Sequence, residues 1–182
     1  MANDSLSYRH FSFFPLEAAL SNRRTFGYPA FLHLVSFVSS DYSLLPLVHY
    51  IVQIAAAFVF WAGLRSIGIS PWVSFLSAAP LLASNSMMTF AKFMLSDALA
   101  MSLGVMSIGL MLMVEKYRSR ILFWFSLAAV LFLTYQVRPA MLFLVPFVSF
   151  FGLLLFWLKK CFYRQERIPK EIATGLLAAS LL

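Results

Sequence analysis

Five long apolar segments separated by short gaps constrain the fold of this chain more than any other feature. They cover residues 44–64, 71–86, 95–114, 121–137 and 140–158, and a sixth apolar segment begins at Ile172 and is cut off at Leu182. A helix needs about 20 apolar residues to cross a bilayer, and somewhat fewer when flanking residues anchor its ends. Each of the five segments is therefore predicted to be a transmembrane helix.

The composition favours lipid over water as the solvent. Hydrophobic residues make up 62% of the 182 residues and charged residues only 12%, whereas soluble domains carry about 25% charged residues. The alternating polarity of a membrane barrel is absent, so the spans are expected to be helical. The predicted fold class is all-α: a polytopic transmembrane helical bundle over residues 44–182, with short interfacial helices in an outer N-terminal loop over residues 1–43.

The basic residues predict the orientation of this bundle. Nine of the fourteen lie in the gaps that follow the first, third and fifth segments: Arg65, Lys116, Arg118, Arg120, Lys159, Lys160, Arg164, Arg167 and Lys170. The positive-inside rule places these gaps in the cytoplasm and the N-terminal loop outside. A net charge of +7 suggests a nucleic-acid partner in a soluble protein, but here it follows membrane topology, so no nucleic-acid partner is predicted. We expect a multi-pass protein of a bacterial inner or cell membrane.

The outer N-terminal loop carries no export signal of its own, because residues 1–10 are polar and no apolar core follows them. A helix upstream of Met1 would explain the export of this loop, and the short sixth segment favours the same interpretation, that of a fragment of a longer protein. The alternative is a complete protein whose N-terminal tail is translocated by its first span. Residues 11–16 and 29–39 are apolar but too short to cross, and predict interfacial helices.

A few polar residues and prolines lie within the apolar segments. Pro80 and Pro146 are expected to kink their helices. His49 and Gln53 are four residues apart on one helical face, which is typical of hydrogen bonding between membrane helices. Cys161 is the only cysteine, so no intrachain disulfide can form. The three histidines have no cysteine partners and no ligand spacing, so no metal site is predicted from them.

Four polar residues on the outer side are the candidates for a functional site. Lys92 and Asp97 flank the start of the third span, where a structural salt bridge or an interface anchor is the alternative to a binding role. Arg138 precedes Pro139, which favours an extended backbone; its guanidinium suits a phosphate, and snorkelling to lipid headgroups is the alternative. Asp4 is either a solvated carboxylate or a general base or metal ligand.

Asp4, Asp97 and Arg138 each lie in a short motif, and a fourth motif begins at Arg24. Residues 4–8 are Asp-Ser-Leu-Ser-Tyr, residues 24–29 are Arg-Thr-Phe-Gly-Tyr-Pro, residues 95–97 are Leu-Ser-Asp and residues 137–139 are Val-Arg-Pro. In order and spacing they resemble the N-terminal half of the GT-C membrane glycosyltransferases, in the family 39-like group of protein O-mannosyltransferases and aminoarabinose transferases. Phe26 stands where the family usually has proline, and the family's first helix and C-terminal half have no counterpart here.

The resemblance implies a glycosyltransferase that moves a sugar from a polyprenyl-phosphate donor to an acceptor at the outer membrane face, with the donor and membrane lipid as partners. Asp4 would be catalytic, as a base or by orienting the acceptor. The substrate-binding residues would be Arg24, Tyr28, Lys92, Asp97 and Arg138. No cofactor is implied other than a divalent cation. The alternative is a non-enzymatic scaffold or a transporter-like subunit, although the spans lack the charged relay of a transport site.

Overall fold

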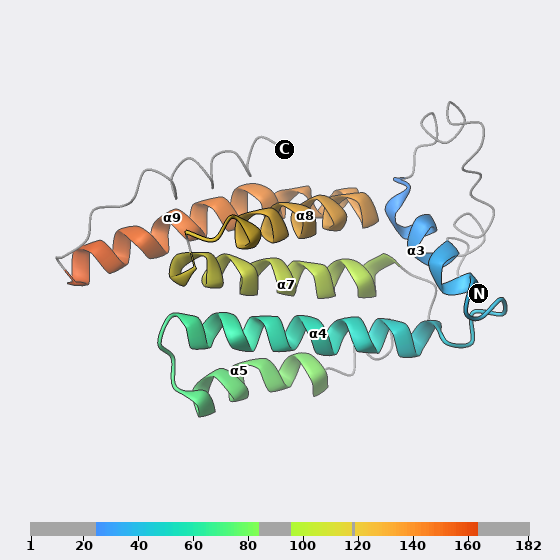
Figure 1. The fold of residues 1–182 in the computed structure, drawn as a ribbon, viewed down its shortest axis with the longest axis horizontal. Coiled ribbons are helices and arrows are strands. Elements are labelled where there is room, and N and C mark those ends of the chain that lie inside the picture. Colours follow the sequence, from blue (N-terminus) through green and yellow to red (C-terminus); the bar gives the residue numbers. More distant parts are fainter. Residues whose placement is uncertain (1–24, 84–95, 118, 164–182) are drawn as a thin grey trace.

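The computed structural model describes residues 25–83, 96–117 and 119–163, and every regular element in these ranges is a helix (Figure 1). In chain order they are α3 (Gly27–Ser36), α4 (Leu45–Ser66), α5 (Pro71–Ala83), α7 (Ser96–Lys116), α8 (Ile121–Val137), the 3-10 helix η1 (Pro139–Phe143) and α9 (Leu144–Tyr163). The predicted all-α class is confirmed for this part of the chain.

The long helices lie side by side and the chain reverses direction between one and the next (Figure 1). At one end α4 and α7 begin, α8 finishes and α3 lies across them; we call this the α3 end. At the other end α4 and α7 finish and α8 begins; we call this the loop end. The basic gaps after α4 and α7 therefore lie at one end of the bundle, as alternating spans require, and the side of the membrane they face stays a prediction.

Two helices are long and apolar enough to cross a membrane, Leu45–Ser66 and Ser96–Val114. Three further apolar helical segments are shorter: Pro71–Ala83, Ile121–Val137 and Pro139–Leu155. The first, third and fourth predicted segments agree with α4, α7 and α8 to within two residues at each end. The count of five spans stays a prediction, since only α4 and α7 are long and apolar enough to cross a membrane. The sixth segment lies outside the described residues.

Prolines mark several helix starts. Pro71 is the first residue of α5, where a missing N–H has no intrahelical partner to lose. Pro80 lies inside α5 as expected. Pro146, expected inside a span, is instead the third residue of α9, directly after the change from 3-10 to α-helix at Leu144. The helical segment itself begins one residue before the predicted one, at Pro139, where η1 starts.

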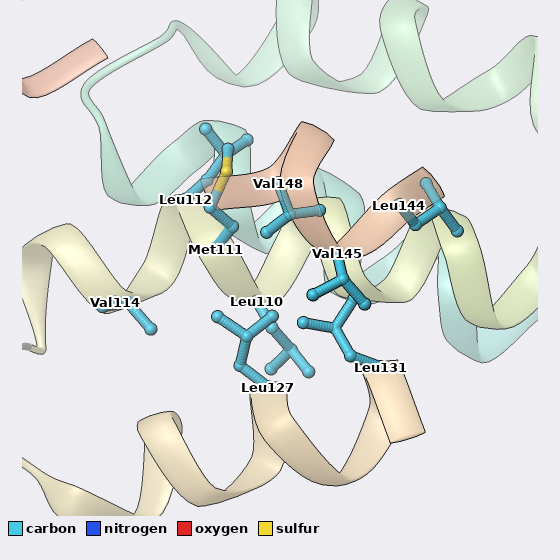
Figure 2. Close-up of a cluster of buried hydrophobic side chains, with 9 residues drawn as sticks. All are labelled: Leu110, Met111, Leu112, Val114, Leu127, Leu131, Leu144, Val145 and Val148. Atoms are coloured by element: carbon cyan, nitrogen blue, oxygen red, sulfur yellow. The ribbon is translucent and has the colours of Figure 1, made fainter. Parts of the chain in front are cut away.

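The core lies between α7, α8 and α9 (Figure 2). Its buried side chains are Leu110, Met111, Leu112, Val114, Leu127, Leu131, Leu144, Val145 and Val148. Of the two candidate spans, 61% of the α7 window is buried but only 28% of the α4 window. Thus α7 is the central helix, and much of α4 presents apolar side chains outward, as a lipid-facing helix does.

Small residues join α4 to α7. Ala56 and Ala57 are buried on α4, and a Cβ added to Gly109 of α7 would lie 2.7 Å from the carbonyl oxygen of Val59. The hydroxyl of Ser66 donates to the Leu112 carbonyl across the same contact at 3.0 Å. Close backbone approach through small residues is typical of helix pairs in membranes.

Candidate functional site at the α3 end

Asp97 and Arg138 form an ion pair at the α3 end. Nη1 of Arg138, directly after α8, donates to Oδ1 of Asp97 in the first turn of α7. The Arg138 side chain is 36% exposed and that of Asp97 is 24% exposed. Both groups are half-buried and keep some contact with the outside of the bundle, and an ion pair that stays in contact with solvent adds only about 0–1 kcal/mol to stability.

The backbone fixes the position of Arg138. Its N–H makes the last helical hydrogen bond of α8, to the Thr134 carbonyl at 3.0 Å, and its own carbonyl accepts from Met141 in η1 at 2.9 Å. Its φ of −149° and ψ of 106° are extended, because the ring of the following Pro139 disfavours the helical conformation. The predicted extended geometry of Arg138 is confirmed, and its backbone is anchored between α8 and η1.

Asp97 owes its position to the start of α7. It is the second residue of that helix and the acidic residue of its first turn. The N–H groups of a first turn lack helical partners and carry a partial positive charge, which stabilises a carboxylate. The helix start and Arg138 thus both stabilise the negative charge of Asp97.

Helix α3 packs beside this pair. Tyr28 is 0% exposed and belongs to a buried cluster drawn from α3, α4, α7 and α8: Tyr28, Leu32, Val35, Leu45, Leu99, Ala100 and Val137. A Cβ on Gly27 would lie 2.5 Å from the carbonyl carbon of Gln136, so only glycine permits this approach. Tyr28 was predicted to bind substrate; in the structure it is buried, and it holds α3 against the residue that precedes Arg138.

An aromatic stack connects α3 to α4, and the sequence analysis missed it. The His49 ring lies 5.5 Å from the Phe31 ring and 6.3 Å from the Tyr28 ring, all nearly parallel. The spacing of three between Tyr28 and Phe31, which places both on one helical face, was the available signal. Gln53, one turn after His49, donates to the Leu81 carbonyl of α5, which confirms the predicted hydrogen bond between helices.

Asp41 organises the turn between α3 and α4. Its Oδ1 accepts from the hydroxyls of Ser39 (2.5 Å) and Ser43 (2.9 Å) and from the Ser43 N–H (3.2 Å). These bonds, that of the Ser39 hydroxyl first, lower the pKa of Asp41 from 3.8 to about 2. Tyr42 next to it adopts a positive φ of 58°. The Ser-Ser-Asp-Tyr-Ser run was a turn signal that the sequence analysis did not use.

The remaining predicted site residues, Asp4, Arg24 and Lys92, lie outside the described residues. Of the predicted set, the structure therefore brings Asp97 and Arg138 into contact and places Tyr28 in the packing beside them. Within the described ranges no group of three or more His, Cys, Asp or Glu side chains is placed to hold a metal ion. A divalent cation thus stays a prediction.

The half-buried Asp97–Arg138 pair offers two chemical functions side by side. The carboxylate can accept a hydrogen bond from a hydroxyl, and the guanidinium has further N–H groups for an anion. No protein-family model, curated protein or solved structure matches this chain. The resemblance to GT-C enzymes accordingly rests on the four motifs.

Proposed function

We propose that this chain is a multi-pass protein of a bacterial inner or cell membrane that binds a polyprenyl-phosphate-sugar and takes part in transferring the sugar, in the manner of a GT-C glycosyltransferase. The observation that carries the proposal is the Asp97–Arg138 ion pair. It joins two of the four motifs, and Gly27 of a third packs on the backbone that leads to Arg138. Segments far apart in sequence thus meet at one end of the bundle.

The chemistry of the pair suits a lipid-linked phosphate. One Nη of Arg138 binds Asp97, and the other guanidinium N–H groups can bind phosphate oxygens in the paired geometry that arginine favours. A donor anchored in the bilayer by its polyprenyl chain carries its phosphate at the level of the helix ends. Asp97 can accept a hydrogen bond from a hydroxyl of the attached sugar.

In the transfer, the bond between the sugar's anomeric carbon and the phosphate oxygen breaks, and a bond from the acceptor oxygen forms. Negative charge collects on the leaving phosphate, where Arg138 stabilises it. The acceptor proton passes to a base, the role that the resemblance gives to Asp4. Arg24 and Lys92 would add positive charge near the donor phosphate.

Binding of an undecaprenyl monophosphate probe tests the proposal without knowledge of the sugar. With the whole chain in nanodiscs, we expect the phosphate to bind more tightly than undecaprenol, and Arg138→Ala to weaken phosphate binding about 10- to 100-fold through loss of charged hydrogen bonds. Arg65→Ala at the loop end, where the guanidinium donates to the Ile69 carbonyl, is the matched control and should leave binding unchanged. Equal affinity for the phosphate and the alcohol would overturn the proposal.

The alternative, a non-enzymatic scaffold, finds support in the same pair, because it ties α7 to α8. A scaffold needs the pair only for packing. It predicts that Arg138→Ala lowers the midpoint of thermal unfolding, while undecaprenyl phosphate shows no preference over undecaprenol in any variant.

A further inference from the structure

Two cations gather on one aromatic ring at the loop end. Nζ of Lys116 lies 5.5 Å from the centre of the Tyr117 ring, and the guanidinium carbon of Arg120 lies 5.8 Å from the same centre. Like charges repel, so two long cationic side chains on an exposed loop would ordinarily separate. The negative face of the Tyr117 ring instead attracts both, so both positive charges lie within about 6 Å of the centre of one ring.

The ring that gathers them is itself fixed. Tyr117 stacks on Phe123 with ring centres 4.8 Å apart and planes at 11°, and Phe123 packs against the core of α7, α8 and α9. The Tyr117 N–H donates to the Met113 carbonyl, and its own carbonyl accepts from the Arg120 N–H at 2.9 Å. Tyr117 is thus held in place by its backbone hydrogen bonds and by stacking on Phe123.

An apolar surface continues from these cations along α8. Ile121, Leu122 and Phe125 are 83%, 67% and 72% exposed, and their spacing places them on one face of the helix. Lys116 follows the last residue of the α7 candidate span, Val114, by two positions, which is about 3 Å along a helix axis. Positive charge therefore stands at the end of an apolar face, where a bilayer has its headgroups.

We propose that Lys116, Tyr117 and Arg120 form a binding site for the anionic headgroup of a phospholipid, whose acyl chains lie along Ile121, Leu122 and Phe125. Within the described part of the chain neither cation has an ion-pair partner, in contrast to Arg138 beside Asp97. A headgroup phosphate would supply the missing negative charge. Because the ring already holds the cations in place, little side-chain freedom is lost on binding. The site lies at the opposite end from Asp97 and does not depend on the glycosyltransferase proposal.

Lipid retention by the whole chain in nanodiscs of equal parts phosphatidylcholine and phosphatidylglycerol tests this site. Native mass spectrometry counts the phosphatidylglycerol that stays bound. We expect Arg120→Gln to reduce retention about fivefold and the double variant Lys116→Gln with Arg120→Gln about 25-fold. Tyr117→Leu keeps every charge but releases the cations, and should reduce retention about threefold; Tyr117→Phe should retain lipid like the unaltered chain.

Arg65→Gln is the matched control for diffuse charge. Arg65 lies at the same end and its guanidinium donates to the Ile69 carbonyl, away from the Tyr117 ring. A specific site predicts a much smaller effect for Arg65→Gln than for Arg120→Gln. Equal losses of lipid retention in the two variants would mean that any cation at this end is enough to retain the lipid, and the proposal would be wrong. Unchanged retention in folded Tyr117→Leu would refute it as well; if that variant does not fold, the comparison of the two arginine variants decides alone.

Discussion

Gly63 of α4 and Gly109 of α7 lie so close that a Cβ added to Gly63 would be 2.5 Å from the carbonyl oxygen of Gly109. The contact joins the two helices that are long and apolar enough to cross a membrane. In lipid no hydrophobic effect drives two helices together, so close backbone packing carries much of the association. Side chains larger than hydrogen at either position must separate the helices.

Gly109→Ala should therefore destabilise the fold by about 1–3 kcal/mol, because the new methyl group meets backbone that cannot move aside. The matched control is Gly104→Ala on the same helix, where a Cβ would face the end of the Leu144 side chain at 3.2 Å. That side chain can shift, and alanine favours helix over glycine, so the control should be near neutral. Denaturant titration in detergent measures both. Similar losses of unfolding free energy in Gly109→Ala and Gly104→Ala would show that the close backbone contact at Gly109 does not stabilise the fold.

Gly27→Ala should detach α3 from the end of α8, because its Cβ would overlap the backbone of Gln136. We expect faster hydrogen exchange in α3, and weaker undecaprenyl phosphate binding if α3 borders the site. Leu34→Ala is the control, since Leu34 lies on the same helix but is mostly exposed. Unchanged exchange in Gly27→Ala would show that α3 is not held by this contact.

Exchanging the charges of Asp97 and Arg138 distinguishes the contribution of the ion pair to stability from its contribution to phosphate binding. Asp97→Arg combined with Arg138→Asp keeps an ion pair of opposite direction, so a double-mutant cycle should show a favourable coupling of about 0–1 kcal/mol, while the cation in the first turn of α7 keeps the double variant less stable than the unaltered chain. Phosphate binding should not recover, because the cation has left the position that Pro139 sets. Recovery of both stability and phosphate binding would mean that only the presence of a cation matters.

The low pKa of Asp41, about 2 against 3.8 ordinarily, makes the turn between α3 and α4 sensitive to acid. A carboxylate with a lowered pKa in the folded state stabilises that state above pH 3.8, and its contribution disappears as the pH falls from about 4 to about 2. The protection factor against hydrogen exchange at the Ser43 N–H, which donates to Asp41, should fall in this window. Ser39→Ala, which removes the first cause of the low pKa, should move the window upward, whereas Ser36→Ala should not.

Helix positions could be predicted from the sequence more completely than helix contacts. The bounds of α7 and α8 follow from apolar runs that end at basic residues. Helix α3 was expected over residues 29–39 and occupies Gly27–Ser36, because Pro29 fits within the first turn of a helix rather than having to begin it. Its place at a membrane interface stays a prediction.

The contacts depend on how each helix is rotated about its axis. The pattern of α8 does not specify this rotation, since apolar residues surround the helix on nearly all sides. Asp97 and Arg138 could be assigned to the same end from topology, but their direct bond could not be derived from residues 41 positions apart. The close approach of Gly63 and Gly109 could not be predicted from the sequence either, because a glycine in a membrane helix does not by itself indicate a contact with another helix.

The docking of Gly27 on Gln136 has a consequence for biosynthesis. At the usual 5–20 residues per second, Gln136 is added to the growing chain roughly 5 to 20 seconds after Gly27. During that interval the side of α3 that carries Gly27 lacks the α8 backbone on which it packs, and needs lipid or a chaperone to cover it. The completion of α8 therefore sets the moment at which this end of the protein closes.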